Sequence, residues 1–179
     1  MIPESHSLRH LFHEIVADCY AEHAGLHDDE VSTYVADLLT DFTQMEKLYS
    51  LRDATGKPVK QLSEMLTASD PIHGTAESFD VERKIRKHIG DYTLFFTGMY
   101  PEAVHPDREP ENFLLMVQAG KESYYIVSQF NVFEYAIEAP LFGRLADSFE
   151  SCVYGLNMVR MELDRRHALP APARPMRLM

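Results

Sequence analysis

The sequence predicts an all-α fold: a single domain of five to seven helices, packed as an irregular bundle around a central apolar helix. Three observations lead to this prediction. Apolar residues recur at spacings of three and four along most of the 179 residues, which is the pattern of helices that bury one face. Glycine and proline gather between these stretches, where they end helices and form turns. The hydrophobic fraction of 45% and the charged fraction of 25% are those of an ordinary globular protein.

The first two predicted helices follow each other closely. Residues 5–24 form the first, and Gly25 ends it, since glycine readily adopts the backbone conformation found after a helix. The acidic residues at positions 28–30 then mark a helix start, because negative charge is stabilised near a helix N-terminus. The second helix is expected to run from there to about residue 45.

The third and fourth predicted helices are separated by turns and prolines. A turn at residues 54–58 precedes a short third helix at residues 59–66, and Asp70-Pro71 ends that unit. The fourth helix, at residues 79–100, has a charged start and an aromatic second half, and Pro101 closes it. Its two glycines, Gly90 and Gly98, are expected to permit close helix contact, although each costs roughly 1 kcal/mol relative to alanine.

The second half of the chain contains a loop, an ambiguous segment and two long helices. Three prolines oppose regular structure at residues 102–111, and the apolar run at residues 113–117 fits either a helical turn or a short strand. Residues 121–139 are predicted to form the central helix, because apolar side chains surround it except for a stripe of Asn131, Glu134 and Glu138. The sixth helix covers residues 140–167, with Pro140 in its first turn.

The domain is therefore expected to span residues 1–167. Residues 168–179 contain Pro170, Pro172 and Pro175, a composition typical of a flexible extended segment. We predict a proline-rich C-terminal tail there.

The charge and the cysteines restrict the partners and the compartment. A formal net charge of −11 opposes binding to nucleic acid, which relies on Lys and Arg. The one basic cluster lies at residues 83–88, where the four-residue spacings Asp80–Lys84 and Lys87–Asp91 favour local ion pairs. Cys19 and Cys152 have apolar neighbours typical of buried thiols. With neither a leader nor a membrane-spanning run predicted, we expect a soluble cytoplasmic protein.

Three histidines at the start of the chain are the main candidates for a metal site. His6, His10 and His13 have spacings of four and three that place them on one helical stripe, and imidazole is a common metal ligand. The stripe lies roughly opposite the apolar face of the first helix, so these side chains should face water without the buried surroundings that orient metal ligands. We therefore predict no metal site and no cofactor.

A small-molecule site inside the bundle is a second possibility. His88 lies at the edge of the apolar face of the fourth helix, Tyr92 follows one turn later, and Glu134 belongs to the polar stripe of the predicted central helix. A buried carboxylate beside an imidazole could exchange protons with a ligand. The alternative is that Glu134 pairs with a basic side chain at the surface and that His88 is a packing residue.

The aromatic segment carries the one resemblance to other proteins. The residues Gly90-Asp91-Tyr92-Thr93-Leu94-Phe95-Phe96-Thr97-Gly98-Met99-Tyr100-Pro101-Glu102, followed by Gly120-Lys121-Glu122-Ser123-Tyr124-Tyr125, resemble a pattern in an all-helical family of uncharacterised bacterial proteins of similar length. The resemblance extends over most of the chain and implies packing positions, not catalytic residues.

These observations favour a non-enzymatic function. The sequence contains no Gly-x-Ser-x-Gly elbow, no phosphate-binding glycine loop and no Ser-His-Asp arrangement that can be assigned, so no common catalytic motif is present. We expect an interaction or regulatory module that forms a homodimer, since two-fold dimers are the commonest assemblies. The alternative is the binding or catalytic site with His88, Tyr92 and Glu134.

Overall fold

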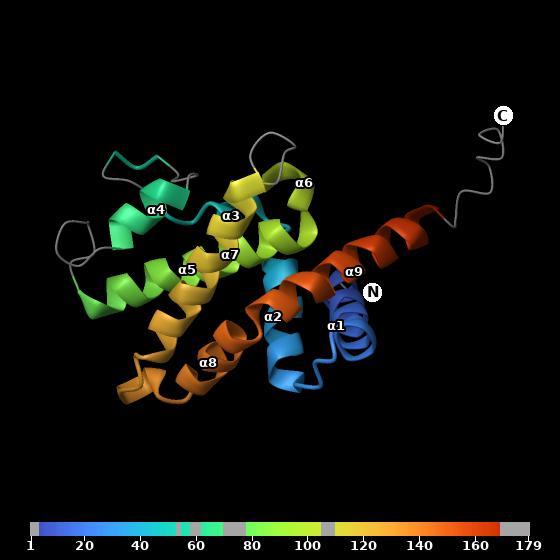
Figure 1. Ribbon diagram of the computed structural model, residues 1–179, viewed down its shortest axis with the longest axis horizontal. Coiled ribbons are helices and arrows are strands. Elements are labelled where there is room, and N and C mark those ends of the chain that lie inside the picture. Colours follow the sequence, from blue (N-terminus) through green and yellow to red (C-terminus); the bar gives the residue numbers. More distant parts are fainter. Residues whose placement is uncertain (1–3, 53–54, 58–61, 70–77, 105–109, 169–179) are drawn as a thin grey trace.

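The computed structural model confirms an all-α bundle (Figure 1). It describes residues 4–52, 55–57, 62–69, 78–104 and 110–168. Their helices are α1 (Glu4–His23), α2 (Asp29–Asp41), α3 (Met45–Leu48), α4 (Leu62–Ser69), α5 (Phe79–Met99), α6 (Pro101–Val104), α7 (Pro110–Ser128), η1 (Phe133–Tyr135), α8 (Ala139–Asp147) and α9 (Phe149–Ala168). Within this described part, seven of the helices have eight or more residues, in agreement with the predicted five to seven.

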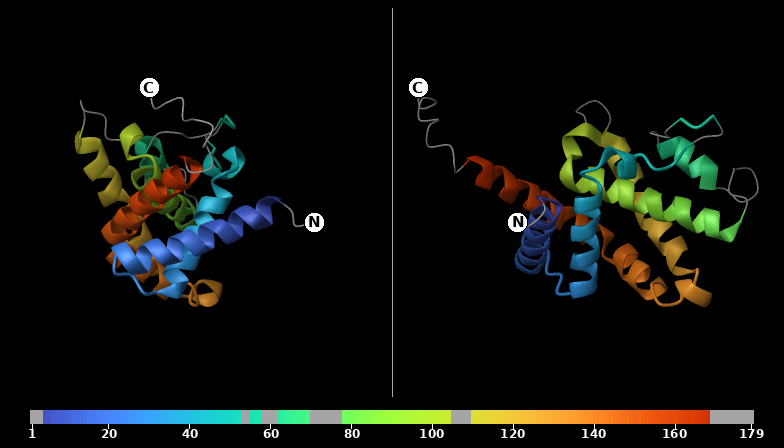
Figure 2. Two further views of the ribbon diagram at one scale, coloured as in Figure 1. Left: turned by 90° about the vertical axis from the view of Figure 1, so that its right-hand side faces the viewer. Right: turned by 180° about the vertical axis from the view of Figure 1, so that it is seen from behind.

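Helix α5 is the centre of the bundle. Thirteen of its 21 residues are buried, and it packs against α2, α4, α6, α7 and α9. Figure 2 shows α1 crossing beside α9 and α2, the two helices that it contacts most. The aromatic half of α5 is therefore enclosed on several sides, which explains why it can be apolar around most of its circumference.

The prediction that residues 121–139 form one central helix is wrong. Helix α7 ends at Ser128, and a turn leads through η1 to α8. The amide groups of Gln129 and Phe130 donate to carbonyl groups three residues earlier, at 3.0 and 3.1 Å, which is the tightened geometry of a helix end. Asn131 follows, a residue that commonly succeeds a helix C-terminus.

The predicted sixth helix is also divided in the structure. Pro140 lies in the first turn of α8, as expected, but α8 ends before Ser148 and α9 starts at Phe149. The Ser148 hydroxyl donates to the Arg144 carbonyl oxygen at 2.7 Å, a bond that competes with the regular helical pattern. Residues 168–179 cannot be compared with the predicted tail, because residues 169–179 lie outside the described part.

Other boundaries follow local chemistry. Asp28 caps α2, accepting from the backbone amides of Glu30 and Val31 at 3.1 and 3.2 Å, as its acidic start indicated. Residues 113–117 are helical, within α7. The loop predicted at residues 102–111 is helical at both ends, because α6 occupies residues 101–104 and α7 starts at Pro110. Residues 105–109 between them lie outside the described residues.

The two glycines of α5 permit close contact, as predicted. A Cβ atom on Gly90 would lie 2.3 Å from Cε1 of Tyr124 in α7, and one on Gly98 would lie 2.6 Å from Leu156 in α9. Both distances are far below van der Waals contact, so any side chain there would displace the facing helix. These positions bring α7 and α9 directly against the backbone of α5.

The two cysteines are buried and free, as their apolar neighbours indicated. The Tyr20 hydroxyl donates to the Cys152 carbonyl oxygen at 2.9 Å and joins α1 to α9. Burial raises the pKa of the Cys152 thiol to about 11, so this thiol is protonated and unreactive near neutral pH. In the part of the chain that the structure describes, no helix has the length and apolarity needed to cross a membrane.

Candidate functional site

A buried carboxylate joins three helices at the centre of the bundle. Asp91 of α5 accepts from the hydroxyl groups of Tyr34 in α2 and Tyr124 in α7, at 2.6 and 2.7 Å. Lys87, one turn earlier in α5, donates to its other oxygen at 3.1 Å. Burial raises the pKa of both tyrosines well above the ordinary value, and the charge of Asp91 raises it further. The tyrosines are therefore neutral donors, and the cluster connects helices with its hydrogen bonds satisfied.

His88 lies beside this cluster and is only 7% exposed. Its Nδ1 atom is 3.3 Å from the Ser50 hydroxyl, and its ring centroid is about 6 Å from those of Phe42 and Tyr92. Its Nε2 atom is buried and has no hydrogen-bond partner in the described part of the chain. Burial, the main cause, lowers the pKa of His88, and the positive charges of Lys87 and Lys84 lower it further against the opposing effect of Asp91.

Tyr92 and Glu134, the other two residues predicted to line a pocket, lie in different environments. Tyr92 is buried beside His88, and burial raises its pKa to about 12. Glu134 is exposed, on η1. An exposed carboxylate cannot supply the buried acid or base that the sequence suggested. Glu134 is therefore not the buried carboxylate expected beside His88, because α7 ends before that residue and leaves it exposed on η1.

We expect His88 to make folding stability depend on pH. Its folded-state pKa lies below the ordinary value of 6.5, so between these two values the unfolded chain binds a proton that the folded chain does not. Stability should thus fall as the pH decreases below about 6.5. Urea unfolding from pH 5 to 8 should show a shallower decline for His88→Gln than for the wild type. Equal slopes would contradict this prediction, and His10→Gln, at an exposed position, is the control.

The N-terminal histidines do not form a cluster in the described residues. His10 is exposed, and His13 binds Asp37 of α2 through Nε2 at 2.7 Å. The side chain of His6 lies outside the described part of the chain. Among the described residues, no three His, Cys, Asp or Glu side chains are placed to hold a metal ion.

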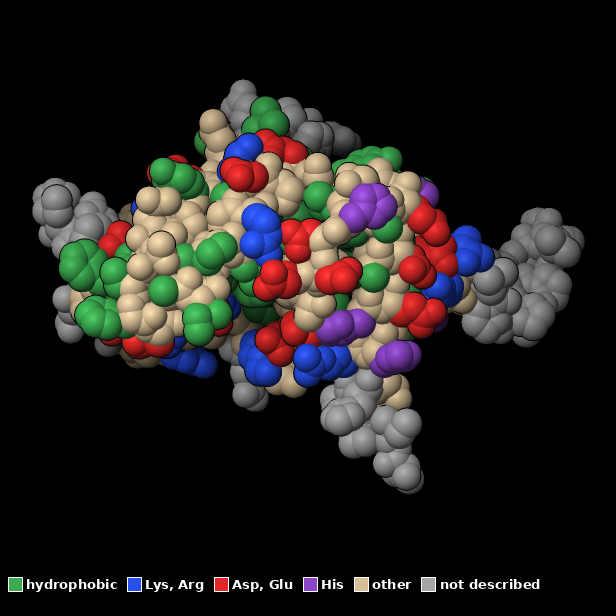
Figure 3. Space-filling view, turned by 90° about the horizontal axis from the view of Figure 1, so that it is seen from below, with side chains coloured by type: hydrophobic (Ala, Val, Ile, Leu, Met, Phe, Trp, Pro, Cys, Tyr) green, Lys and Arg blue, Asp and Glu red, His purple; other side chains and the backbone are tan. Residues whose placement is uncertain are grey.

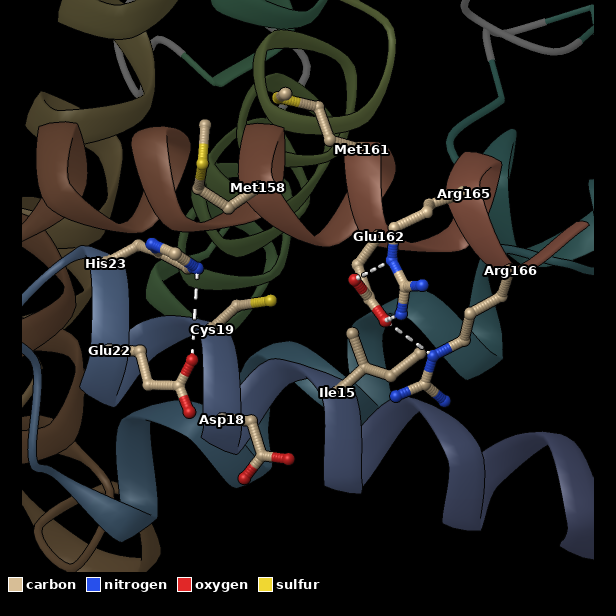
Figure 4. Close-up of a pocket in the computed structure, with 10 residues that line it drawn as sticks. All are labelled: Ile15, Asp18, Cys19, Glu22, His23, Met158, Met161, Glu162, Arg165 and Arg166. Atoms are coloured by element: carbon tan, nitrogen blue, oxygen red, sulfur yellow. Dashed lines mark hydrogen bonds and ion pairs between the residues drawn. The ribbon is translucent and has the colours of Figure 1, made fainter. Parts of the chain in front are cut away.

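A cleft of about 460 Å³ lies between α1 and α9 (Figure 4). Glu162 projects between Arg165 and Arg166, which hold its pKa down at about 2. Burial, with the nearby charge of Glu162, raises the pKa of the Cys19 thiol. The carboxylate is therefore ionised and the thiol protonated, so the two groups offer neither an acid nor a nucleophile at neutral pH.

The most unusual surface of the protein surrounds η1. Four large apolar side chains there face solvent, and we call them the η1 surface: Phe79, Val132, Phe133 and Ile137. Phe133 and Ile137 are each 88% exposed, and Phe79 is 76% exposed. Figure 3 shows hydrophobic side chains gathered over this end of the molecule, at the left of the view. Single exposed apolar residues are normal, whereas a group of them makes this end of the molecule a candidate interaction surface.

Phe133 is held in an unfavourable backbone conformation. Its φ is +50°, the only positive value among non-glycine residues in the described part, and this left-handed region costs roughly 1–2 kcal/mol for a residue with a Cβ atom. A bulky residue here is a rare observation. The conformation places the most exposed aromatic ring of the described residues outward.

Contacts with the start of α5 hold η1 in place. The Tyr135 hydroxyl donates to Asp80 at 2.8 Å, and the Arg83 guanidinium lies 4.1 Å from the centre of the Tyr135 ring. Arg83 also donates to Glu138 at 2.8 Å. The predicted Asp80–Lys84 ion pair does not form, because Asp80 turns to Tyr135, whereas the Lys87–Asp91 pair is confirmed. The η1 surface is therefore supported by a fixed polar network.

Sequence reasoning missed this surface for an identifiable reason. Its residues at 132–137 were assigned to a helix surrounded by neighbours, where apolar side chains on every face are expected. The available signals were Asn131, which favours a helix end, and Pro140, which can begin but not continue a helix.

Comparison of the chain with protein-family models, curated proteins and solved structures gives no match.

Proposed function

We propose that the protein is an interaction module that forms a homodimer through the η1 surface. The observation that supports this best is Phe133, whose ring is 88% exposed on a backbone with φ of +50°. Strained backbone that persists in a folded protein is concentrated at functional positions. An exposed ring on such a backbone is explained if the ring is buried in an assembly.

The charges around the η1 surface favour a protein partner. Asp80, Glu134 and Glu138 lie at its edge, and the chain as a whole carries −11. Nucleic acid and anionic membranes would both be repelled by such an edge. Exposed aromatic rings are enriched where proteins bind proteins. We take the free thiols Cys19 and Cys152 as support for a cytoplasmic location, which is part of the proposal.

A second copy is the partner to which we commit. In a two-fold dimer the same patch faces itself, so the patch formed by Phe79, Phe133 and Ile137 would pack against the same patch of the second copy. The acidic edges of the two copies would then repel each other. Added salt screens this repulsion, so association should become tighter as the salt concentration rises, whereas a partner with basic residues would bind more weakly.

Ile137→Glu should weaken the dimer by about tenfold or more, because each copy then brings a negative charge into the apolar contact. The measurement is light scattering coupled to size-exclusion chromatography over a range of protein and salt concentrations. Leu114→Glu is the matched control, since Leu114 is also exposed but lies on α7. A monomeric wild type at every concentration, or equal effects of the two variants, would overturn the proposal.

Phe133→Gly separates association from folding. Glycine adopts positive φ without the steric cost of a Cβ atom, so the variant should unfold at the same temperature as the wild type or higher. Its dimer should nevertheless dissociate more readily, because the exposed ring is lost. A loss of thermal stability without a change in association would contradict an interface role for Phe133.

A further inference from the structure

A second pocket, which is lined by more charged side chains than the apolar η1 surface, lies between α5 and the end of α2. It has a volume of about 230 Å³, at the small end for ligand sites. Its lining combines apolar side chains with charged ones: Leu38, Asp41, Phe42, Lys47, Ser50, Leu51, Lys84, Lys87, His88 and Asp91. The pocket is therefore suited to a small polar ligand.

The lysines give this pocket an excess of positive charge. Lys47 pairs with Asp41 at 3.2 Å and Lys87 pairs with Asp91 at 3.1 Å. Lys84 forms no ion pair with any residue that the structure describes. Three lysines against two aspartates leave one uncompensated positive charge, in a protein whose net charge is −11. An uncompensated ammonium group beside a pocket favours an anionic ligand.

His88, which lines the same pocket, carries an unused ring nitrogen. Lys87 and His88 lie three and four residues after Lys84 on α5, so each neighbours Lys84 on the helix surface, and all three residues line the pocket. When the Ser50 hydroxyl donates to Nδ1 of His88 across their 3.3 Å separation, the neutral ring carries its proton on Nε2. That buried atom has no partner among the residues that the structure describes, an arrangement that normally calls for explanation by an absent ligand, ion or water.

From these observations we propose that the pocket binds a small phosphate-bearing ligand, with the phosphate group between Lys84, Lys87 and His88. Lysine binds phosphate as a compact point charge. The described lining contains lysine and histidine but no arginine. Phosphate oxygens would accept from the ammonium groups of Lys84 and Lys87, next to the His88 ring that lines the pocket.

The test uses inorganic phosphate as the probe and the full chain as the protein. Nitrogen–proton correlation spectra of the histidine rings are recorded during a titration, with chloride keeping the ionic strength constant so that screening does not change. We expect a saturable shift of the His88 ring signals with a dissociation constant of about 1 mM or tighter. An absence of saturation, or an equal response to chloride alone, would overturn the proposal.

Two variants and a second anion make the result specific. Lys84→Gln, at an exposed position, should keep the fold and weaken phosphate binding by about fivefold or more through the lost charge. Lys121→Gln is the matched control, because Lys121 is on α7 and pairs with Glu150; it should leave binding unchanged. Equal effects of the two variants would overturn the site. Tighter binding of acetate than of phosphate would overturn the ligand class.

Discussion

Asp91→Ala is expected to lower the free energy of unfolding by about 3 kcal/mol, because two tyrosine hydroxyls lose their shared acceptor. A buried donor without a partner costs roughly 1–3 kcal/mol. The Tyr124 side chain is completely buried and its hydroxyl is 2.7 Å from Asp91, so no water can replace the carboxylate readily. Tyr34, at 2.6 Å, is less enclosed and should contribute less. Lys87 is partly exposed and can be hydrated.

Urea unfolding followed by circular dichroism would measure this loss. Asp164→Ala is the control, since Asp164 forms an exposed pair with Arg160 at 3.2 Å and such pairs contribute about 0–1 kcal/mol. In the Asp91→Ala background, Tyr124→Phe should cost less than it does alone, because the hydroxyl has already lost its acceptor. Additive effects, or similar losses for Asp91 and Asp164, would show that the cluster does not hold the helices together.

Gly90→Ala is expected to destabilise the protein by about 1–3 kcal/mol, the usual cost of adding atoms to a packed core. The new Cβ atom would lie 2.3 Å from a carbon of the Tyr124 ring, and that ring is fixed by its bond to Asp91. Moving α7 outward would disturb the same cluster. The higher helix propensity of alanine, about 1 kcal/mol, only partly offsets this steric cost.

The same substitution at Gly143 is expected to have the opposite effect on the free energy of unfolding. Gly143 is also inside a helix, α8, and its nearest neighbour to an added Cβ atom is Ser128 at 3.7 Å, an ordinary contact. Here the higher helix propensity of alanine should stabilise the protein by up to about 1 kcal/mol, because no steric cost opposes it. Thermal and urea unfolding of the two variants should therefore move in opposite directions. A stabilised Gly90→Ala protein would mean that α7 can move away from α5 at little cost.

The candidate surfaces could be predicted only in part. His88 and Tyr92 are predicted from their position on α5 and their rings lie side by side, but of the two only His88 belongs to the described pocket linings. Lys84 was assigned to a surface ion pair that Asp80 does not form. The η1 surface was not identified, because an apolar residue in a buried helix and one in an exposed turn look the same in the sequence when their partners are unknown.

The sequence by itself determined the helical class, the acidic start of α2, the end of α5 at a proline, and the glycines at which α5 meets its neighbours. These features depend on residues within about four positions of one another, a range over which helical geometry and capping act. The tertiary structure alone decided that α5 occupies the centre, that Asp91 joins Tyr34 and Tyr124 from 57 and 33 residues away, and that residues 132–137 face solvent. Burial depends on helices that are distant in the sequence, and local periodicity does not indicate which of them will pack against a given residue.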